Sequence, residues 1–180
     1  MSQKLQHHIS EPALIENPFW AFSLQVYGRD TVKNACLTLQ NRFCADVNIL
    51  LFLCWRNSLG LPNPTADQIE EMTSVIADIN RDVIAPLRTV RTALPGMDTP
   101  GAPEVRKKVL EAELSAEQMA QAALFQAFPH PSLQSEKQDE TALPALVLYF
   151  RTLGTDGPAL DEARPILSSL IEGITSADTA

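Results

Sequence analysis

A run of seven apolar residues, from Ile49 to Trp55, constrains the fold of this 180-residue chain more than any other feature. The run is too short to cross a bilayer, which takes about 20 residues. Because it is apolar on every side, it predicts a helix that is buried on nearly every side. Asp46 is a good N-cap for such a helix, and Gly60 suits its C-terminal end. We therefore expect an all-α protein built around a central helix over residues 46–59.

The remaining sequence has helical periodicity and no strand pattern. Start signals precede three of the expected helices: Asn17 before Pro18, Asp30, and Thr65 with Gln68 three residues later. With the central helix, these predict a bundle of six or seven helices. The other expected helices span residues 17–28, 30–43, 65–94, 104–128, 143–153 and 160–174.

Two of these helices contain a feature with more than one interpretation. Pro86 lies inside the helix over 65–94, where a proline removes a hydrogen bond, so we expect a kink or a break. The helix over 104–128 could restart after Leu114, because Ser115 and Gln118 have capping-box spacing. We favour one continuous helix with Ala116 and Met119 on its apolar side.

The length of the chain suits one domain. Residues 1–16 have no apolar stretch of signal-peptide length and are expected to form a mobile tail. A single helical domain is expected over 17–176, with a flexible loop near 129–141. The chain has three Cys, an odd number without CxxC spacing, which is typical of free thiols in a reducing cytoplasm.

The charge is distributed unevenly along the chain. The formal net charge is −8, which argues against a nucleic-acid binder. Residues 81–108 nevertheless carry six basic and three acidic side chains, a balance of +3. This segment predicts either a basic face for a protein partner or an ordinary solvated surface. Its basic residues are Arg81, Arg88, Arg91, Arg106, Lys107 and Lys108.

A second candidate site consists of polar residues in the apolar segment between Asn17 and Leu59. Asp46 can cap the central helix, Arg42 can pair with it, and Asn48 would lie on the first buried turn. We favour this structural interpretation. The alternative is that the N-terminus of the central helix binds an anion. Trp20, Tyr27 and Trp55 are either core residues or the lining of a ligand pocket. The candidate ligand-binding residues are Trp20, Tyr27, Gln40, Arg42, Asp46, Asn48 and Arg56.

No catalytic constellation is evident in the sequence. The three His residues lie at His7, His8 and His130, outside the expected helices, and no phosphate-binding or nucleophile motif is present. No metal-ligand spacing occurs, so we predict neither a metal nor a cofactor. An enzymatic role is not supported by these residues.

The apolar segment and the later helices resemble a family of conserved bacterial proteins of unknown function. The resemblance covers roughly residues 17–128. It implies a small, single-domain cytosolic bacterial protein and no assigned reaction. The matching elements include Phe19-Trp20, Ser23, Tyr27, Ala35-Cys36-Leu37, Leu39-Gln40, Asp46-Val47-Asn48 and Leu50-Leu51-Phe52.

These observations favour a non-enzymatic, cytoplasmic module that binds a protein partner through the basic face around 81–108. The alternative is a small-molecule binder or enzyme whose pocket, for an anionic or apolar ligand, lies among the first three helices. Nucleic acid and membrane attachment are disfavoured by the acidic charge. A homo-oligomer is compatible with the sequence.

Overall fold

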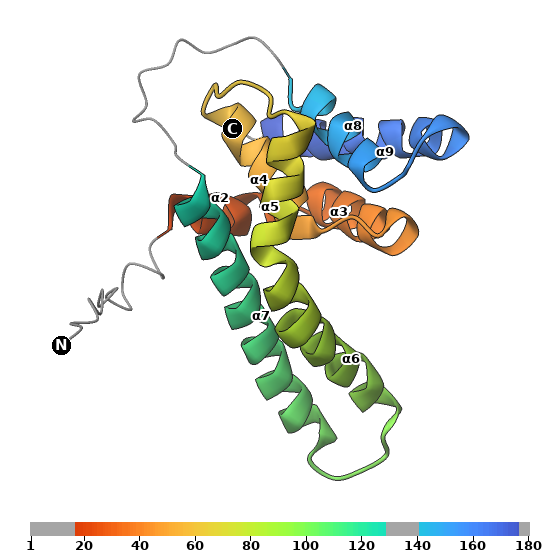
Figure 1. Ribbon diagram of the computed structural model, residues 1–180. Coiled ribbons are helices and arrows are strands. Elements are labelled where there is room, and N and C mark those ends of the chain that lie inside the picture. Colours follow the sequence, from red (N-terminus) through yellow and green to blue (C-terminus); the bar gives the residue numbers. More distant parts are fainter. Residues whose placement is uncertain (1–16, 129–140, 177–180) are drawn as a thin grey trace, which may run out of the picture.

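The computed structural model describes residues 17–128 and 141–176, and all regular structure in these ranges is helical. The predicted all-α class is therefore confirmed, and Figure 1 shows the arrangement of the helices. The expected tail over 1–16 and nearly all of the loop over 129–141 lie outside the described residues. The helices are α2 (Pro18–Tyr27), α3 (Asp30–Phe43), α4 (Val47–Ser58), α5 (Ala66–Ile79), α6 (Ala85–Ala93), α7 (Ala102–Ala127), α8 (Leu143–Thr152) and α9 (Gly157–Thr175).

Helix α4 is the predicted central helix, and it lies in the core. All eight consecutive residues from Asn48 to Trp55 are buried. The aromatic rings of α4 pack closely with α2, since the Phe52 and Phe19 ring centroids are 5.0 Å apart in an edge-on contact. Burial on every side explains why the sequence of α4 lacks the polar face of an amphipathic helix.

Most of the predicted helix starts are confirmed by side-chain caps. Asn17 accepts from the Phe19 amide at 2.9 Å, and Thr65 forms a capping box with Gln68. The predicted cap at Asp30 was wrong by one residue. Arg29 occupies the N-cap position and makes no side-chain cap bond, while Asp30 begins the helix. The Arg29 guanidinium donates instead to the carbonyl oxygens at the end of α9, as described below.

Helices α5 and α6 form one continuous rod, because a π-helical turn, η1 (Asn80–Ile84), joins them. In this wider turn the Ala85 amide donates to the Asn80 carbonyl, five residues earlier. An α-helical proline ring clashes with the carbonyl four residues before it. For Pro86 that carbonyl belongs to Asp82, which lies in the widened turn. The proline therefore bends the rod without breaking it (Figure 1). Counting the rod as one helix gives seven helices among the described residues.

Helix α7 is a single helix from Ala102 to Ala127, so the favoured continuous interpretation is confirmed. It runs alongside α6 and η1 and also contacts α5 (Figure 1). A short 3-10 turn, η2 (Leu94–Gly96), and a loop connect the two. No residue of α6 is buried, and the buried residues of α7 begin at Glu113. We call α6 and residues 102–112 the arm, because it projects from the remaining helices.

The apolar side predicted for α7 was partly wrong. Ala116 is buried, as expected, but Met119 is 43% exposed. The polar residues Glu113 and Gln121 are buried instead, at 4% and 3% exposure. Periodicity alone could not place them there, because their burial depends on partners from other helices.

Helix α9 packs along α3 and closes the side of the bundle opposite the arm (Figure 1). The contact is close at Gly173, where an added Cβ would lie 2.9 Å from Val32 Cγ2. Arg29 Nη1 donates to the carbonyl oxygens of Gly173 and Ile174 at 2.9 and 2.8 Å. These bonds satisfy carbonyls that the last turn of a helix leaves unpaired. In the described part of the chain, no helix has the length and apolarity needed to span a bilayer.

Candidate functional site

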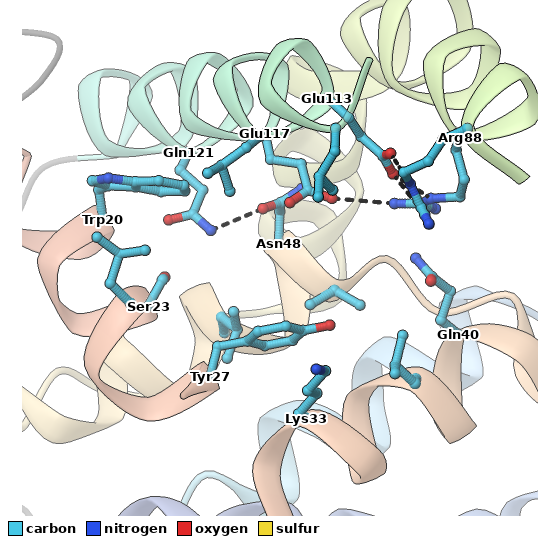
Figure 2. A pocket seen from close by; sticks show the side chains of 17 residues that line it. Trp20, Ser23, Tyr27, Lys33, Gln40, Asn48, Arg88, Glu113, Glu117 and Gln121 are labelled. Atoms are coloured by element: carbon cyan, nitrogen blue, oxygen red, sulfur yellow. Dashed lines mark hydrogen bonds and ion pairs between the residues drawn. The ribbon is translucent and has the colours of Figure 1, made fainter. Parts of the chain in front are cut away.

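A cavity of about 390 Å³ lies between α2, α3, α4 and α7, and we call it the large cavity (Figure 2). Helix α6 contributes Arg88 and Arg91 to its wall. Small-molecule sites usually have volumes of about 300–1,000 Å³. The apolar part of the lining comes from Trp20, Leu24, Leu37, Val47, Leu51, Leu110 and Leu114.

Buried polar atoms without partners lie against the large cavity. Gln121 Nε2 donates to Asn48 Oδ1 at 2.9 Å, which joins α7 to the first turn of α4 (Figure 2). Gln121 Oε1 and Ser23 Oγ have no hydrogen-bond partner among the described residues. Both residues are 3% exposed. An unsatisfied buried polar group costs about 1–3 kcal/mol. A ligand that bonds to these atoms would remove that cost.

Four charged side chains form an ion-pair network along one wall of the large cavity. Glu113 accepts from Arg88 Nε at 3.1 Å and from Arg91 through both Nε and Nη2, the latter at 3.2 Å. Arg88 Nη2 also donates to Glu117 Oε1 at 3.2 Å. The network joins α6 to α7, and its two guanidinium groups balance its two carboxylates.

The two carboxylates of this network differ in their pKa values. Burial alone would raise the pKa of Glu113, but hydrogen bonds from Arg91 and Arg88 outweigh burial and lower it. Burial raises the pKa of Glu117, and the charge of Arg88 offsets this effect only in part. Across the cavity, burial raises the pKa of Tyr27 to about 12, so its hydroxyl keeps its proton at neutral pH.

A second cavity of about 200 Å³, the small cavity, lies beside the first and shares Gln40, Val47, Asn48, Arg88 and Glu117 with it. Asp46 also lines it and caps α4. The Asp46 carboxylate accepts from the Asn48 amide at 2.7 Å, from the Ile49 amide at 3.4 Å and from Asn80 Nδ2. Burial raises the pKa of Asp46 and these bonds oppose the rise. Asn80 begins the π-helical turn, so that turn places a donor on the cap of α4.

The model of the family described as protein of unknown function (DUF2390) matches residues 18–124, more than half of the chain. The chain belongs to this family. The resemblance seen in the sequence is thus confirmed. Neither the search of curated proteins nor the search of solved structures found a match. Every residue that lines the large or the small cavity falls inside the DUF2390 segment, whereas α8 and α9 lie outside it.

The structure brings together five of the seven predicted ligand-binding residues. Trp20, Tyr27, Gln40 and Asn48 line the large cavity, and Asp46 lines the small one. The favoured interpretation of Asp46 as a helix cap agrees with its bonds to the α4 amides. The same carboxylate also borders a cavity.

Arg42 and Arg56 line neither cavity. The predicted pairing of Arg42 with Asp46 was wrong, because Arg42 pairs with Glu162 of α9 on the surface. The guanidinium of Arg56 lies 5.9 Å from the centre of the Phe52 ring, and burial lowers its pKa. Because Arg42 lies on α3 and Glu162 on α9, their ion pair helps to hold α9 against α3.

The predicted basic face around 81–108 does not form one surface, which corrects the sequence interpretation. Arg81 pairs with Asp78 and Asp82 at 2.8 and 2.7 Å. Arg88 and Arg91 turn toward α7 and pair with its carboxylates. Arg106, Lys107 and Lys108 are exposed in the first turns of α7, and none of them forms an ion pair with a described residue.

The sequence interpretation did not assign Ser23, Lys33, Glu113, Glu117 or Gln121 to a site. A signal for three of them is visible in hindsight. Glu113, Glu117 and Gln121 are spaced at i, i+4 and i+8, which places them on one side of a helix otherwise rich in alanine. Ser23 and Lys33 have no comparable signal. In the described ranges, no group of three or more His, Cys, Asp or Glu side chains could hold a metal ion.

Proposed function

We propose that this protein binds a small organic molecule in the large cavity. The observation that carries the proposal is a cavity of suitable volume lined by two residues, Ser23 and Gln121, each of which has a buried polar atom without a partner among the described residues. Natural folds satisfy nearly all of their buried polar groups. Four buried side-chain atoms lack a partner among the described residues, and Ser23 and Gln121 are the two of these residues that line the large cavity, where a ligand could complete their hydrogen bonds.

The composition of the wall supports the same proposal. Ligand sites are mostly apolar, with a few polar groups that fix the orientation of the ligand. Leucines and Trp20 form the apolar part here, while Tyr27, Gln40 and Asn48 supply hydrogen-bonding groups. The ion-pair network holds Glu113 and Glu117 in place, so this wall is preorganised. Binding, rather than a reaction, is what these groups support.

A tryptophan at the rim of the cavity tests this proposal. Leu114 lines the cavity and is 48% exposed, so Leu114→Trp should block the cavity without disturbing the core. Met119 lies on the same helix, is 43% exposed and does not line the cavity, which makes Met119→Trp the matched control. A fragment library screened by ligand-detected NMR should give hits that Leu114→Trp abolishes and Met119→Trp retains. The proposal fails if no fragment binds or if both variants bind alike.

A protein partner is a second candidate, supported by the exposed arm. Val90 and Val105 on the arm are 47% and 48% exposed, and Met97, in the loop that connects its two helices, is 53% exposed. Exposed apolar patches rimmed by polar residues mark sites of interaction with partners. The expected partner is a protein with an acidic face that complements Arg106, Lys107 and Lys108.

Charge reversal on the arm tests this second candidate. A variant with Lys107→Glu and Lys108→Glu should lose a defined, acidic-faced protein that co-purifies with the wild type from its native cells, and should lose its direct binding to that purified protein. Arg164→Glu, on α9, is the control and should retain the partner. An unchanged set of co-purifying proteins would exclude this use of the arm.

We place the protein in the cytoplasm. Cys36, Cys44 and Cys54 are all free, and Cys36 and Cys54 are buried in the core. Free thiols are typical of reducing compartments. Cell fractionation with an antibody to this chain would check the location, and recovery in an oxidising compartment would contradict it.

A further inference from the structure

The large cavity has two chemically different ends, and this division indicates which class of ligand would fit it. In Figure 2 the Tyr27 hydroxyl points toward the end where Gln40 and Lys33 lie, whereas Trp20 and Ser23 lie at the other end. The Tyr27 hydroxyl makes no hydrogen bond with any described residue. One end is therefore rich in free hydrogen-bond donors, and the other is mainly aromatic and aliphatic.

The charges around the cavity favour an anion at the donor-rich end. The lining contains three cations, Lys33, Arg88 and Arg91, and two carboxylates, Glu113 and Glu117, a balance of +1 in a chain of net charge −8. The ion-pair network uses both arginines and both carboxylates. Lys33 forms no ion pair in the described part of the chain. Its ammonium group is thus the uncompensated charge at the cavity.

The apolar end continues to the surface of the protein. Leu24 on α2 and Leu110 and Leu114 on α7 line the cavity, yet they are 54%, 46% and 48% exposed. A hydrocarbon chain that leaves the cavity between α2 and α7 would cover these side chains. Burial of apolar surface contributes roughly 25 cal/mol per Å².

We propose that the large cavity binds an amphipathic carboxylate, with its head group at Lys33, Tyr27 and Gln40 and its hydrocarbon part against Trp20, Leu24 and Leu114. The inference rests on the proposed function of this cavity and specifies its ligand. Lys33 supplies the balancing charge, and the Tyr27 hydroxyl and Gln40 amide donate to the carboxylate oxygens. A ligand with a hydroxyl or amide group partway along its hydrocarbon part would also donate to Ser23 and Gln121, which lie at the Trp20 end.

Three probes that differ only in the head group test this inference: decanoate, decanol and decylamine, measured by titration calorimetry below their aggregation limits. Decanoate should bind about tenfold more tightly than decanol, because its carboxylate accepts charge-assisted hydrogen bonds at the donor-rich end. Decylamine should bind most weakly. Lys33→Met should remove the preference for decanoate over decanol, and Lys33→Arg should keep it. Lys107→Met, at an exposed lysine outside the cavity, is the control and should change neither affinity.

The outcomes separate the failure of this inference from that of the proposed function. If decanol and decanoate bind equally and Leu114→Trp blocks both, the cavity binds ligands but the head-group assignment is wrong. Tighter binding of decylamine would also overturn the assignment and would point to Glu117. If none of the three binds while other fragments do, the amphipathic class is wrong. Only the absence of any ligand sensitive to Leu114→Trp removes the proposed function itself.

Discussion

At the scale of single residues, Asp46 has the most demanding position. Its buried carboxylate accepts from two amides of α4 and from Asn80. Asp46→Ala should lower the free energy of unfolding by about 1–3 kcal/mol, because it removes a helix cap and leaves Asn80 Nδ2 without its partner. Urea unfolding followed by circular dichroism measures this loss.

The control for this prediction is Asp46→Asn. An asparagine retains an acceptor for the α4 amides and is as good an N-cap as aspartate. It should therefore recover most of the stability that Asp46→Ala loses. If alanine and asparagine at this position are equally destabilising, the carboxylate acts through its charge and not as a cap.

The helix caps also show what a sequence predicts well at this scale. Asn17, Asp46 and Thr65 cap helices as expected, since the capping bond joins residues that are close in sequence. The partner of Arg42 could not be predicted in this way. It lies 120 residues away, on α9, and the choice between Asp46 and Glu162 depends on how α3 and α9 pack.

At the scale of helices, two effects oppose each other at Gly173, where α9 packs on α3: the helix propensity of the residue and the space available for its side chain. Glycine inside a helix is about 1 kcal/mol less favourable than alanine. At Gly173, however, an added Cβ would lie 2.9 Å from Val32 Cγ2 and 3.2 Å from Thr31 Cγ2. Val32 is fully buried and β-branched, so it cannot move aside easily.

Gly173→Ala should therefore lower the free energy of unfolding by about 1–2 kcal/mol, because the overpacking outweighs the gain in helix propensity. In a Val32→Ala background the closest obstructing methyl group is absent and the Thr31 Cγ2 contact at 3.2 Å remains, so the same change should cost less than in the wild type. Urea unfolding of the four proteins in this double-mutant cycle measures the coupling. Additive effects would show that Val32 does not limit the approach of α9.

The periodicity of the sequence predicted where the helices lie in the chain. It did not predict how each helix is rotated about its own axis, and hence which of its side chains face a neighbouring helix. The sequence places a proline in a long helix and predicts a disturbance there. It does not show that a π-helical turn absorbs the proline. An extra residue in a helical turn rotates everything after it by about 100° relative to a straight α-helix. Arg88 and Arg91 therefore face α7, and the sequence interpretation placed them on a solvent-exposed stripe.

At the scale of the whole molecule, the candidate site depends on contacts between segments distant in sequence. Asn48 on α4 meets Gln121 on α7, 73 residues later, and Arg88 on α6 meets Glu113 and Glu117 on α7. The sequence identified the α2–α4 half, because polar residues stand out in an apolar segment. The α7 half was missed, because Glu113 and Gln121 look like ordinary surface residues until their partners are known.

The ion-pair network makes the stability of the molecule depend on pH in two opposite ways. The pKa of Glu113 is lower in the folded protein than its ordinary value of 4.5. The contribution of the ionised Glu113 carboxylate to the free energy of unfolding is therefore fully present above pH 4.5 and is lost as the pH falls through the pKa of the folded protein. Glu113→Gln should lower the free energy of unfolding by about 1–3 kcal/mol at pH 7, less than for a fully buried pair because the two arginines are partly exposed. This loss should shrink as the pH is lowered toward 4.

The pKa of Glu117 is raised above the same ordinary value of 4.5. The contribution of a group with a raised pKa is present below the unfolded pKa and is lost as the pH rises through the folded one. Glu117→Gln removes this loss, so the variant should gain stability relative to the wild type between pH 4 and pH 8. Urea unfolding of the wild type and both variants across this range measures the two slopes. If the stability of both variants, relative to the wild type, changes in the same direction with pH, the pKa values of Glu113 and Glu117 are not shifted in opposite directions, and burial does not dominate at Glu117.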